Sequence, residues 1–578
     1  MKYLLNKTCK YNLTDSVSVV DIKTNCQIVF SKPHDEIFKK LFISKLDSEQ
    51  VLEETVAELH IDRIKALNLI NEVIYALLNT RMLIFDNAVV YKNKKLFVNS
   101  ALIELTNQCN FKCPHCYVEK KDFKTLSYID LVNLANDLKK VNTNFVTFTG
   151  GEIFTHKDFL KIYEYFYING FIICLNTNGF FLNDEVFNLF QKYPPCRIEI
   201  SLYGYNNETY ENFTKVKNAY DTVTNNIKKL KALGIKLLLK NVLTNTNKTH
   251  FDKIEQAVDT LNCNFKFDYI AFPQLNTNQE YNPEQISVKE AINRLKKNPK
   301  IQDYYLSIYS KSKNNNKLFK CKINEDSIFI SSDKKISMCL CMQSSSINYT
   351  SLIDNIHQLS SIKEKKYYKN DKCKNCKYIS LCRYCPGKFY LSTGDYHKPP
   401  QWFCDFGKSI YDAFINGVNI VLKRYLDEFE LREACKIVCE NMQKLGHAIT
   451  PKDQKIWKEN ITNSLENKDF YFYLVYFNGK ICGFAELTIF DKKLFVAEIE
   501  LNNEAKNTRI LYKILQFLFN AQEFNSFTEV YFNINNKNEK SISTFSHLGG
   551  ILIEKREKSS LYCLTRANMQ KYFEKLNR

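Results

Sequence analysis

The pattern of apolar and polar positions is most regular in the middle of the chain. There, short apolar runs alternate with stretches whose apolar residues recur at helical spacing, such as Tyr128–Val141 and Asp221–Leu233. Because neighbouring parallel strands need a crossover helix, this alternation predicts an open, partial (β/α)6 barrel over residues 96–312. The expected strands are Ala101–Thr106, Asn144–Thr149, Phe171–Thr177, Arg197–Tyr203, Ile235–Leu243 and Lys266–Phe272.

The first 95 residues show a different order of elements. Strand-like runs at Ser18–Ile22 and Gln27–Phe30 come first, and a hairpin-like run at Met82–Val98 closes the segment. Strands with a small helical bundle predict a winged-helix domain over residues 1–95. The helical patterns between the strands are Glu36–Leu46, Ser48–Leu59 and Asp62–Leu78.

Two further segments follow the predicted barrel. Residues 313–412 have little periodicity and many cysteines. Residues 425–578 again mix strands and helices, with strands expected at Phe470–Phe477, Gly479–Leu487 and Leu494–Leu501. The fold class expected from the whole pattern is therefore a multidomain α/β protein.

Composition and charge limit the expected partners of the protein and its place in the cell. The 578 residues are 45% hydrophobic and 25% charged, with a net charge of +18, which favours anionic partners. No dense Lys/Arg run with interleaved aromatic residues appears, so nucleic acid is not the expected partner. No apolar run reaches the ~18 residues that span a bilayer, and the N-terminus lacks a signal-peptide pattern. We expect a cytoplasmic protein with no membrane association.

A cytoplasmic setting keeps the 20 cysteines reduced, so their tight spacings indicate metal or cluster ligation. Cys109, Cys113 and Cys116 follow directly on the first predicted strand. A four-iron cluster takes one ligand per iron, so three thiolates leave one iron open. The alternative is a zinc site, which needs a fourth ligand that the adjacent His115 is badly placed to supply.

Polar residues also end the next predicted strands, where the chemistry of a barrel gathers. Gly150 and Gly151 would let a ligand approach the backbone, and Glu152 could receive an ammonium group. Lys240, late in the fifth strand, could meet a carboxylate. Ordinary turns, and a solvated lysine, explain the same residues equally simply. The other strand-end runs are Asn176–Gly179 and Ser201–Gly204.

In order and spacing, these motifs resemble the radical S-adenosylmethionine (SAM) enzymes over essentially all of residues 100–310. The resemblance implies that Cys109, Cys113 and Cys116 hold a [4Fe-4S] cluster whose open iron binds SAM. It implies that Gly150, Gly151 and Glu152 receive the SAM ammonium group. The remaining contacts that it implies are Asn176, Thr177 and Ser201 to the ribose or carboxylate, and Tyr117 to the adenine.

The cysteine-rich segment resembles a SPASM domain, which carries one or two auxiliary [4Fe-4S] clusters. On spacing alone, its Cys-x-x-Cys pairs fit a zinc ribbon as well. The family's glycine before the second ligand is Lys334 here, and one residue fewer separates Cys382 from Cys385. The resemblance assigns Cys373, Cys376, Cys382 and Cys404 to one cluster, and Cys321, Cys339 and Cys385 to the other, with Cys341 available as its fourth ligand.

The end segments resemble two further families. Residues 1–95 resemble the PqqD-like element that binds a leader peptide as an added strand, here near Ser16–Phe30. Residues 425–578 resemble a GNAT-type acetyltransferase, which implies acetyl-CoA. However, Asn503–Thr508 stands in place of that family's glycine-bearing pyrophosphate loop. A domain that binds peptide or adds stability is the alternative.

Together, these resemblances imply an enzyme that generates a 5′-deoxyadenosyl radical and removes hydrogen from a ribosomally made precursor peptide. A thioether or C–C cross-link would result, and flavodoxin or ferredoxin would donate electrons. An alternative with the same chemistry is a sulfatase-type protein maturase that forms formylglycine. An alternative of another class is a zinc-binding regulatory or nucleic-acid-binding protein.

Overall fold

The structure is a computed structural model that groups into two compact units. The barrel unit comprises residues 1–287, 316–372 and 385–400, and the C-terminal unit comprises residues 288–315, 373–384 and 401–578. The residues described are 3–5, 9–13, 17–21, 26–79, 82–85, 90–91, 94–95, 98, 100–118, 123–141, 143, 145–273, 282–312, 318–319, 327–352, 354–356, 358–359, 370–506 and 509–576.

The barrel unit is built on a nine-stranded sheet in the order β13-β12-β11-β10-β9-β8-β14-β15-β16. Strands β8 to β13 pair in parallel and in chain order, as the alternating pattern predicts. Their bounds are β8 Ser100–Thr106, β9 Phe145–Gly150, β10 Ile172–Thr177, β11 Arg197–Ser201, β12 Leu237–Val242 and β13 Asn264–Asp268.

The sixth strand is shorter at its carboxyl end than the sequence predicts. The Asp268 side chain accepts hydrogen bonds from the backbone N–H groups of Tyr269 (2.8 Å) and Ile270 (3.2 Å). This local turn competes with strand pairing, so β13 ends at Asp268 although the apolar run continues.

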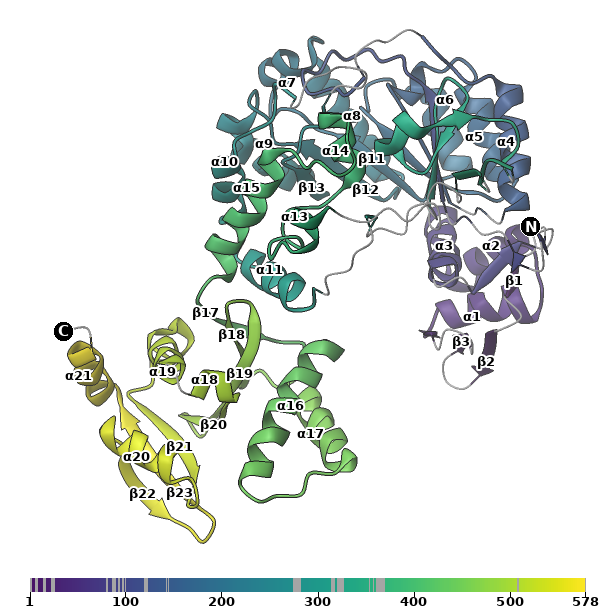
Figure 1. The fold of residues 1–578 in the computed structure, drawn as a ribbon. Helices are drawn as coiled ribbons and strands as arrows, with labels where there is room; N and C mark the ends of the chain where they lie inside the picture. Colours follow the sequence, from purple (N-terminus) through teal and green to yellow (C-terminus); the bar gives the residue numbers. More distant parts are fainter. Residues whose placement is uncertain are drawn as a thin grey trace. The chain divides into compact units, whose positions relative to one another are not determined.

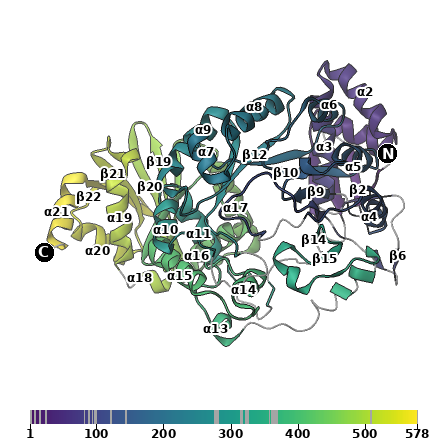
Figure 2. The same ribbon diagram turned by 90° about the horizontal axis from the view of Figure 1, so that it is seen from above.

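Helices connect the parallel strands and pack on the sheet (Figures 1 and 2). Several begin at capping residues, such as Ser127, which forms a capping box with Asp130. Their apolar faces and the strands form one continuous core. The bounds are α4 Tyr128–Lys140, η2 Ile153–Thr155, α5 Phe159–Ile168, α6 Asp184–Lys192, α7 Asn207–Thr214, α8 Ala219–Ala232, η3 Lys248–His250 and α9 Phe251–Leu261.

The cysteine-rich segment extends this sheet, which its weak pattern did not predict. Strand β14 (Ser327–Ile330) pairs in parallel with β8, and β15 (Lys335–Ser337) and β16 (Ile347–Asn348) follow antiparallel (Figure 2). The turn before β15 places Lys334 at φ +59°, the left-handed region that favours glycine. This conformation explains why a glycine is usual at this position. Further helices of the segment are η4 Leu340–Ser345 and α14 Pro386–Thr393.

The N-terminal domain has a three-stranded antiparallel sheet in the order β2-β3-β4. The predicted strands and helices are confirmed where their residues are described. Strand β3 is central, so among the described residues the edge strands of this sheet are β2 and β4, and Ser16 and residues 22–25 of the predicted edge lie outside the described residues. The bounds are β1 Tyr3–Leu5, β2 Cys9–Leu13, β3 Val17–Asp21, β4 Cys26–Phe30, α1 His34–Phe38, η1 Lys39–Ile43, α2 Ser48–Leu59, α3 Arg63–Asn79, β5 Leu83–Phe85, β6 Val90–Tyr91 and β7 Lys94–Lys95.

This domain packs against the amino ends of the barrel strands. Its core includes Phe145 and Ile172, the first residues of β9 and β10, together with Cys196 just before β11. Glu72 on α3 also bonds Lys236, just before β12, at 2.6 Å. The domain therefore lies at the end of the sheet opposite to the carboxyl ends of its strands.

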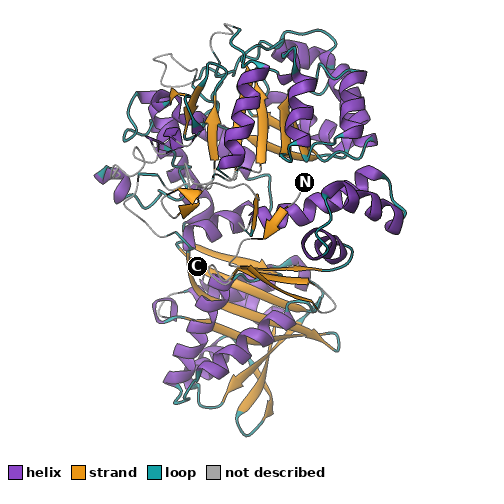
Figure 3. Cartoon of the chain, turned by 90° about the vertical axis from the view of Figure 1, so that its right-hand side faces the viewer, coloured by secondary structure: helices purple, strands orange, loops and turns teal. Residues whose placement is uncertain are grey.

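The C-terminal unit contains a seven-stranded sheet in the order β17-β18-β19-β20-β21-β23-β22, drawn as the long orange arrows of Figure 3. Its pairs are antiparallel except β20 with β21, which pair in parallel only over Leu494–Val496. The bounds are β17 Val418–Lys423, β18 Phe470–Phe477, β19 Lys480–Phe490, β20 Lys493–Leu501, β21 Glu529–Asn535, β22 Ile551–Lys555 and β23 Ser559–Thr565.

Helices cover both faces of this sheet. The buried apolar face of α19 (Ile510–Asn520) joins the core on one side, and α16 (Glu428–Lys444) contacts β19 and β20 on the other. None of the helices in the described part of the chain is long and apolar enough to cross a membrane. The remaining helices are α10 Val288–Leu295, α11 Ile301–Ser310, α13 Asp371–Lys374, α15 Gln401–Ile410, η5 Tyr411–Ile415, α17 Pro451–Ser464, α18 Asn503–Lys506, η6 Gln522–Phe524, α20 Glu539–His547 and α21 Arg566–Leu576.

Candidate functional site

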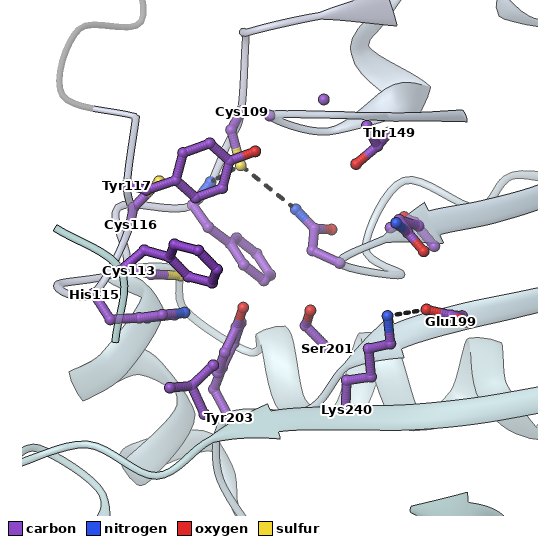
Figure 4. Close-up of a pocket in the computed structure, with 18 of the residues that line it drawn as sticks. Cys109, Cys113, His115, Cys116, Tyr117, Thr149, Glu199, Ser201, Tyr203 and Lys240 are labelled. Atoms are coloured by element: carbon purple, nitrogen blue, oxygen red, sulfur yellow. Dashed lines mark hydrogen bonds and ion pairs between the residues drawn. The ribbon is translucent and has the colours of Figure 1, made fainter. Parts of the chain in front are cut away.

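A cavity of about 310 Å³ opens at the carboxyl ends of the barrel strands (Figure 4). The loop after β8 and the ends of β9 to β12 supply its walls, so the strand-end motifs predicted from the sequence meet in one place. The predicted residues that line it are Cys109, Cys113, Cys116, Tyr117, Gly150, Gly151, Asn176, Thr177, Ser201 and Lys240.

The three cysteines lie on a loop that is held by its own backbone and by a neighbouring helix. Cys116 N–H donates to the Cys113 carbonyl at 3.2 Å, and Lys112 N–H donates to the Thr214 carbonyl of α7 at 2.9 Å. The Cys109 sulfur accepts a hydrogen bond from Asn178 Nδ2 at 3.8 Å (Figure 4). These contacts turn the thiols of one short loop toward the same cavity.

Gly150 and Gly151 form the cradle that the sequence predicts. A Cβ at Gly150 would lie 2.3 Å from the Thr106 carbonyl oxygen, and a Cβ at Gly151 would lie 2.1 Å from that of Gln108. No real Cβ approaches backbone this closely, so only glycine lets β9 end directly against the start of the cysteine loop. The exposed backbone of the pair then forms part of the cavity wall.

Glu152 is brought to the same strand end but does not line the cavity. Its carboxylate is buried and accepts hydrogen bonds from Thr177 Oγ1 (2.6 Å), Asn178 N–H (2.6 Å) and Phe154 N–H (3.2 Å). Burial raises the pKa of Glu152 to about 7, although these hydrogen bonds favour the charged form. In this structure the carboxylate therefore joins the ends of β9 and β10.

The other polar residues at the strand ends divide into paired and unpaired groups. Lys240 forms an ion pair with Glu199 on the neighbouring strand β11 (Figure 4). Asn176 Oδ1 is buried in the cavity wall without a hydrogen-bond partner among the described residues. A buried unsatisfied oxygen is costly, so Asn176 is placed to accept a hydrogen bond from a bound molecule.

Aromatic rings close the end of the cavity beside the cysteines. The His115 ring lies 5.2 Å from the rings of Tyr203 and Phe213, and its Nδ1 is buried with no partner in the described part of the chain. Tyr117 lies 6.4 Å from Phe272. Burial lowers the pKa of His115 to about 4, so its ring is neutral near pH 7. This end of the cavity suits a flat, neutral heterocycle.

A family profile decides what this domain is. Residues 103–261 match the profile of the radical SAM superfamily. These residues form a radical SAM domain. The donor set fits that identity, because three thiols, a glycine cradle and an unpaired amide oxygen share one cavity.

Individual relatives of the radical SAM domain are more distant. The chain is 26% identical to Fe-coproporphyrin III synthase of Methanosarcina barkeri over 188 residues, or 31% of this chain and 47% of that protein. It is 31% identical over 138 residues to the antilisterial bacteriocin subtilosin biosynthesis protein AlbA of Bacillus subtilis, or 23% of this chain and 31% of that one. The chain thus spans less than half the length of either relative.

Solved structures resemble the chain over a longer range. Streptococcus suis SuiB bound to precursor peptide SuiA aligns with a TM-score of 0.45 and 12% identity. That alignment covers 70% of this chain and 99% of SuiB.

Several residues of the radical SAM cavity were not among those that the sequence predicts. The sequence indicates His115 only as a poorly placed zinc ligand, although its place between Cys113 and Cys116 is a signal for the site. Glu199 lies two residues before Ser201, so period-two alternation puts both on one face of β11. The sequence indicates Asn178 only as part of a turn. The apolar lining residues Val242, Ile270 and Phe272 carried no signal that separates them from core residues.

The cysteines of the cysteine-rich segment fall into two sets, one in each unit. In the barrel unit, the Cys341 thiol hydrogen-bonds with those of Cys339 and Cys385, and a Cβ at Gly387 would lie 2.8 Å from the Cys341 Cβ. In the C-terminal unit, a Cβ at Gly407 would lie 2.8 Å from the Cys382 Cβ. Cys321 lies outside the described residues, and Cys373, Cys376 and Cys404 complete the second set.

These sets are not arranged around a single point. Among the described residues, no group of three or more His, Cys, Asp or Glu side chains is gathered as one metal ion requires. A four-iron cluster binds each thiolate to a different iron, so its ligands need not converge. Gly387 and Gly407 each bring their helix backbone close to one cysteine, Cys341 in the barrel unit and Cys382 in the C-terminal unit.

Proposed function

We propose that the chain is a radical SAM enzyme that modifies a peptide. The observation that carries the proposal is the cavity shared by three thiols, the glycine pair and the unpaired Asn176 oxygen. With a [4Fe-4S] cluster and SAM bound, the site would supply a 5′-deoxyadenosyl radical that removes a hydrogen atom from the substrate. The protein supplies ligands, orientation and an enclosed wall.

The residues of the site take separate roles in this proposal. Cys109, Cys113 and Cys116 hold the cluster, and the backbone of Gly150 and Gly151 receives the SAM ammonium group. Asn176 and Ser201 contact the ribose or carboxylate, with Thr177 and Lys240 beside them. His115 and Tyr117 enclose the adenine. Because its oxygens are already bonded to Thr177 and Asn178, Glu152 acts as a positioning residue that fixes the two strand ends.

A precursor peptide is the substrate that the other features favour. The chain shares 31% identity over 138 residues with a protein named for the biosynthesis of a bacteriocin. The N-terminal domain leaves strand β4 at the edge of its sheet, where a leader peptide can add a strand. We propose a thioether or C–C cross-link as the product.

The outer cysteine sets are the proposed sites of auxiliary clusters. Cys339, Cys341 and Cys385 would hold one with Cys321, and the C-terminal unit's cysteines would hold the other. Four thiolates leave no iron open, so such clusters would pass an electron from the substrate rather than bind it. Flavodoxin or ferredoxin would supply electrons for the first step.

The C-terminal sheet has the strand order expected of a GNAT-type domain, with one parallel pair that separates after Val496. The helix α18 occupies Asn503–Lys506, where that family has a glycine-bearing loop for acetyl-CoA. Without glycine, backbone N–H groups approach a pyrophosphate less closely. We therefore propose a binding domain here rather than an active acetyltransferase.

Anaerobic reconstitution of the full chain with iron, sulfide, SAM and dithionite tests the proposal. We expect 5′-deoxyadenosine and about twelve irons per chain if all three clusters form. Cys113→Ala should abolish the product. Cys263→Ala is the matched control, because that thiol contacts the Leu261 carbonyl away from the cavity. Zinc without sulfide in the native protein would contradict the proposal.

A further inference from the structure

The Cys109 sulfur accepts two hydrogen bonds, one from its own loop and one from a neighbouring strand end. The Phe111 backbone N–H, two residues further along the loop, donates to this sulfur at 3.4 Å. Asn178, directly after β10, donates from its side-chain Nδ2 at 3.8 Å, which is drawn as a dashed line at Cys109 in Figure 4. Asn178 is 69 residues away in the sequence, so only the fold brings this donor to the cysteine.

The backbone beyond Asn178 fixes which end of its amide faces the sulfur. The Phe180 N–H donates to Asn178 Oδ1 at 3.0 Å, and because an N–H can only donate, the atom on that side is the oxygen. The nitrogen therefore lies on the side of Cys109. Nδ2 carries two hydrogens, so it can donate to Asn110 Oδ1 at 2.8 Å and to the Cys109 sulfur at the same time.

Glu152 sets the position from which Asn178 donates. Its Oε2 accepts from the Asn178 backbone N–H, and its Oε1 accepts from Thr177 Oγ1, both at 2.6 Å. Thr177 Oγ1 in turn accepts from the Gly179 N–H at 2.9 Å. Both chain neighbours of Asn178 are thus held, and Asn178 itself is only 7% exposed. A donor that is fixed and shielded from water needs no reorganisation when the charge on its acceptor changes.

A hydrogen bond to a cysteine ligand acts on the electron that an iron–sulfur cluster accepts. Reduction places more negative charge on the thiolate sulfurs, so an N–H donor stabilises the reduced form more than the oxidised form. The reduction potential rises as a result. The Asn178 amide lies beside Cys109 in the wall of the cavity, where the low local dielectric strengthens this interaction.

We propose that Asn178 is a positioning residue for the radical SAM cluster, whose Cys109 ligand it holds and whose reduction potential it raises by the N–H···S hydrogen bond. The inference rests on the proposed function, in which Cys109 is a cluster ligand. Asn178 acts through this cysteine, whereas Asn176, two residues earlier, is the residue proposed to contact SAM. Glu152 acts one step further away, because it holds the Asn178 backbone.

Potentiometric titration of the reconstituted full chain, followed by the EPR signal of reduced clusters, tests this role. The signal that SAM alters, and that Cys113→Ala lacks, belongs to the radical SAM cluster. Asn178→Ala removes the donor without adding a charge. At a fixed potential, its ratio of reduced to oxidised cluster should therefore fall about threefold or more.

A second variant separates the donor from the fold of the turn. Asn178→Asp keeps an acceptor for the Phe180 N–H but loses the donor to Cys109, so it also serves if Asn178→Ala does not fold. Its ratio of reduced to oxidised cluster should fall further, because a carboxylate then lies beside the sulfur.

Asn226→Ala is the matched control. Asn226 Nδ2 donates to the carbonyls of Gly179 (2.9 Å) and Phe180 (3.3 Å), so its loss loosens the same turn and leaves the donor to Cys109 in place. Its ratio should equal that of the native chain. Equal ratios in the native chain and both Asn178 variants, or an equal fall in Asn226→Ala, overturn the inference. Absence of any cluster signal in the native chain overturns the proposed function and this inference with it.

Discussion

Two buried glutamates, one in each unit, show how differently the same side chain can be used. Glu152 and Glu486 are both almost inaccessible, and burial raises the pKa of each to about 7. Glu152 nevertheless receives hydrogen bonds from Thr177, Asn178 and Phe154, whereas Glu486 has an oxygen with no partner in the described residues.

The difference separates a carboxylate that holds two strand ends together from a carboxylate that keeps one unsatisfied oxygen. The donors of Glu152 come from three places along two strand ends, so its carboxylate holds those ends in one geometry. Glu486 is surrounded by carboxylates and rings, and its Oε1 has no donor among the described residues. Glu152 and Glu486 therefore share burial and a raised pKa, and their hydrogen-bond partners decide what each carboxylate does.

Glu152→Leu should lower local stability more than any other variant considered, and it best separates the role of Glu152 from that of Glu486. Leucine leaves three buried donors without an acceptor, so we expect the local stability to fall by at least about 3 kcal/mol. Hydrogen exchange of peptides covering β9 and β10 measures this change. Glu486→Gln is the matched variant, and at pH 4.5, where Glu486 is protonated, the free energy of exchange in β19 should change by less than about 0.5 kcal/mol. Similar losses at the two sites would remove the distinction.

The pH dependence of stability should reveal both carboxylates. A glutamate whose native pKa is about 7, above its ordinary value of 4.5, stabilises the fold below the lower value and loses this contribution as pH rises through the higher one. We expect Glu486 alone to lower the protection of β19 by about 3 kcal/mol between pH 4.5 and pH 8, and Glu498, whose pKa burial raises to about 9, to add a further loss. Glu486→Gln should remove its own part of the fall and leave the part due to Glu498. An unchanged profile in the variant would argue against the assignment.

The barrel site was more predictable from the sequence than the buried carboxylates around Glu486. Apolar runs followed by Cys109 or Gly150 predict strand ends directly, because the signal is local. The orientation of Glu152 depends on Thr177, 25 residues away, and no local pattern shows that contact. Glu498 and Glu500 alternate with apolar residues, as on a solvent-facing strand. Only the packing of α16 on that face turns them into a buried cluster.

Gly151→Ala should have an intermediate effect. It tests whether the barrel site tolerates a side chain where β9 meets the cysteine loop. Its Cβ would lie 2.1 Å from the Gln108 carbonyl oxygen, so the cysteine loop must move, at a cost of about 1–3 kcal/mol. Iron and sulfide per chain after reconstitution should fall. Gly446→Ala meets nothing within 4 Å, so it should cost only the strain of its positive φ and keep full iron loading. Full iron and sulfide loading of Gly151→Ala would contradict the role of Gly150 and Gly151 in shaping the cysteine loop.

Lys236→Ala should have the smallest effect. The Lys236 and Glu72 side chains are 51% and 45% exposed, and solvent screens such a pair, so its loss should cost less than about 1 kcal/mol. Thermal unfolding followed by circular dichroism should therefore differ little from that of the native chain. A large loss would mean that this contact, unlike most exposed pairs, anchors the N-terminal domain.

The position of the N-terminal domain sets a minimum distance between the two parts of the proposed peptide substrate, the part bound by the domain and the part that is modified. The domain contacts Phe145 and Ile172 at the first residues of their strands, whereas the cavity lies beyond the last ones. Six strand residues at ~3.3 Å each make a wall about 20 Å high. In the proposed function, a peptide held at β4 passes along this sheet before another part of it reaches the cavity. The proposal therefore predicts that the recognised and modified parts of the peptide are separated by at least about six extended residues.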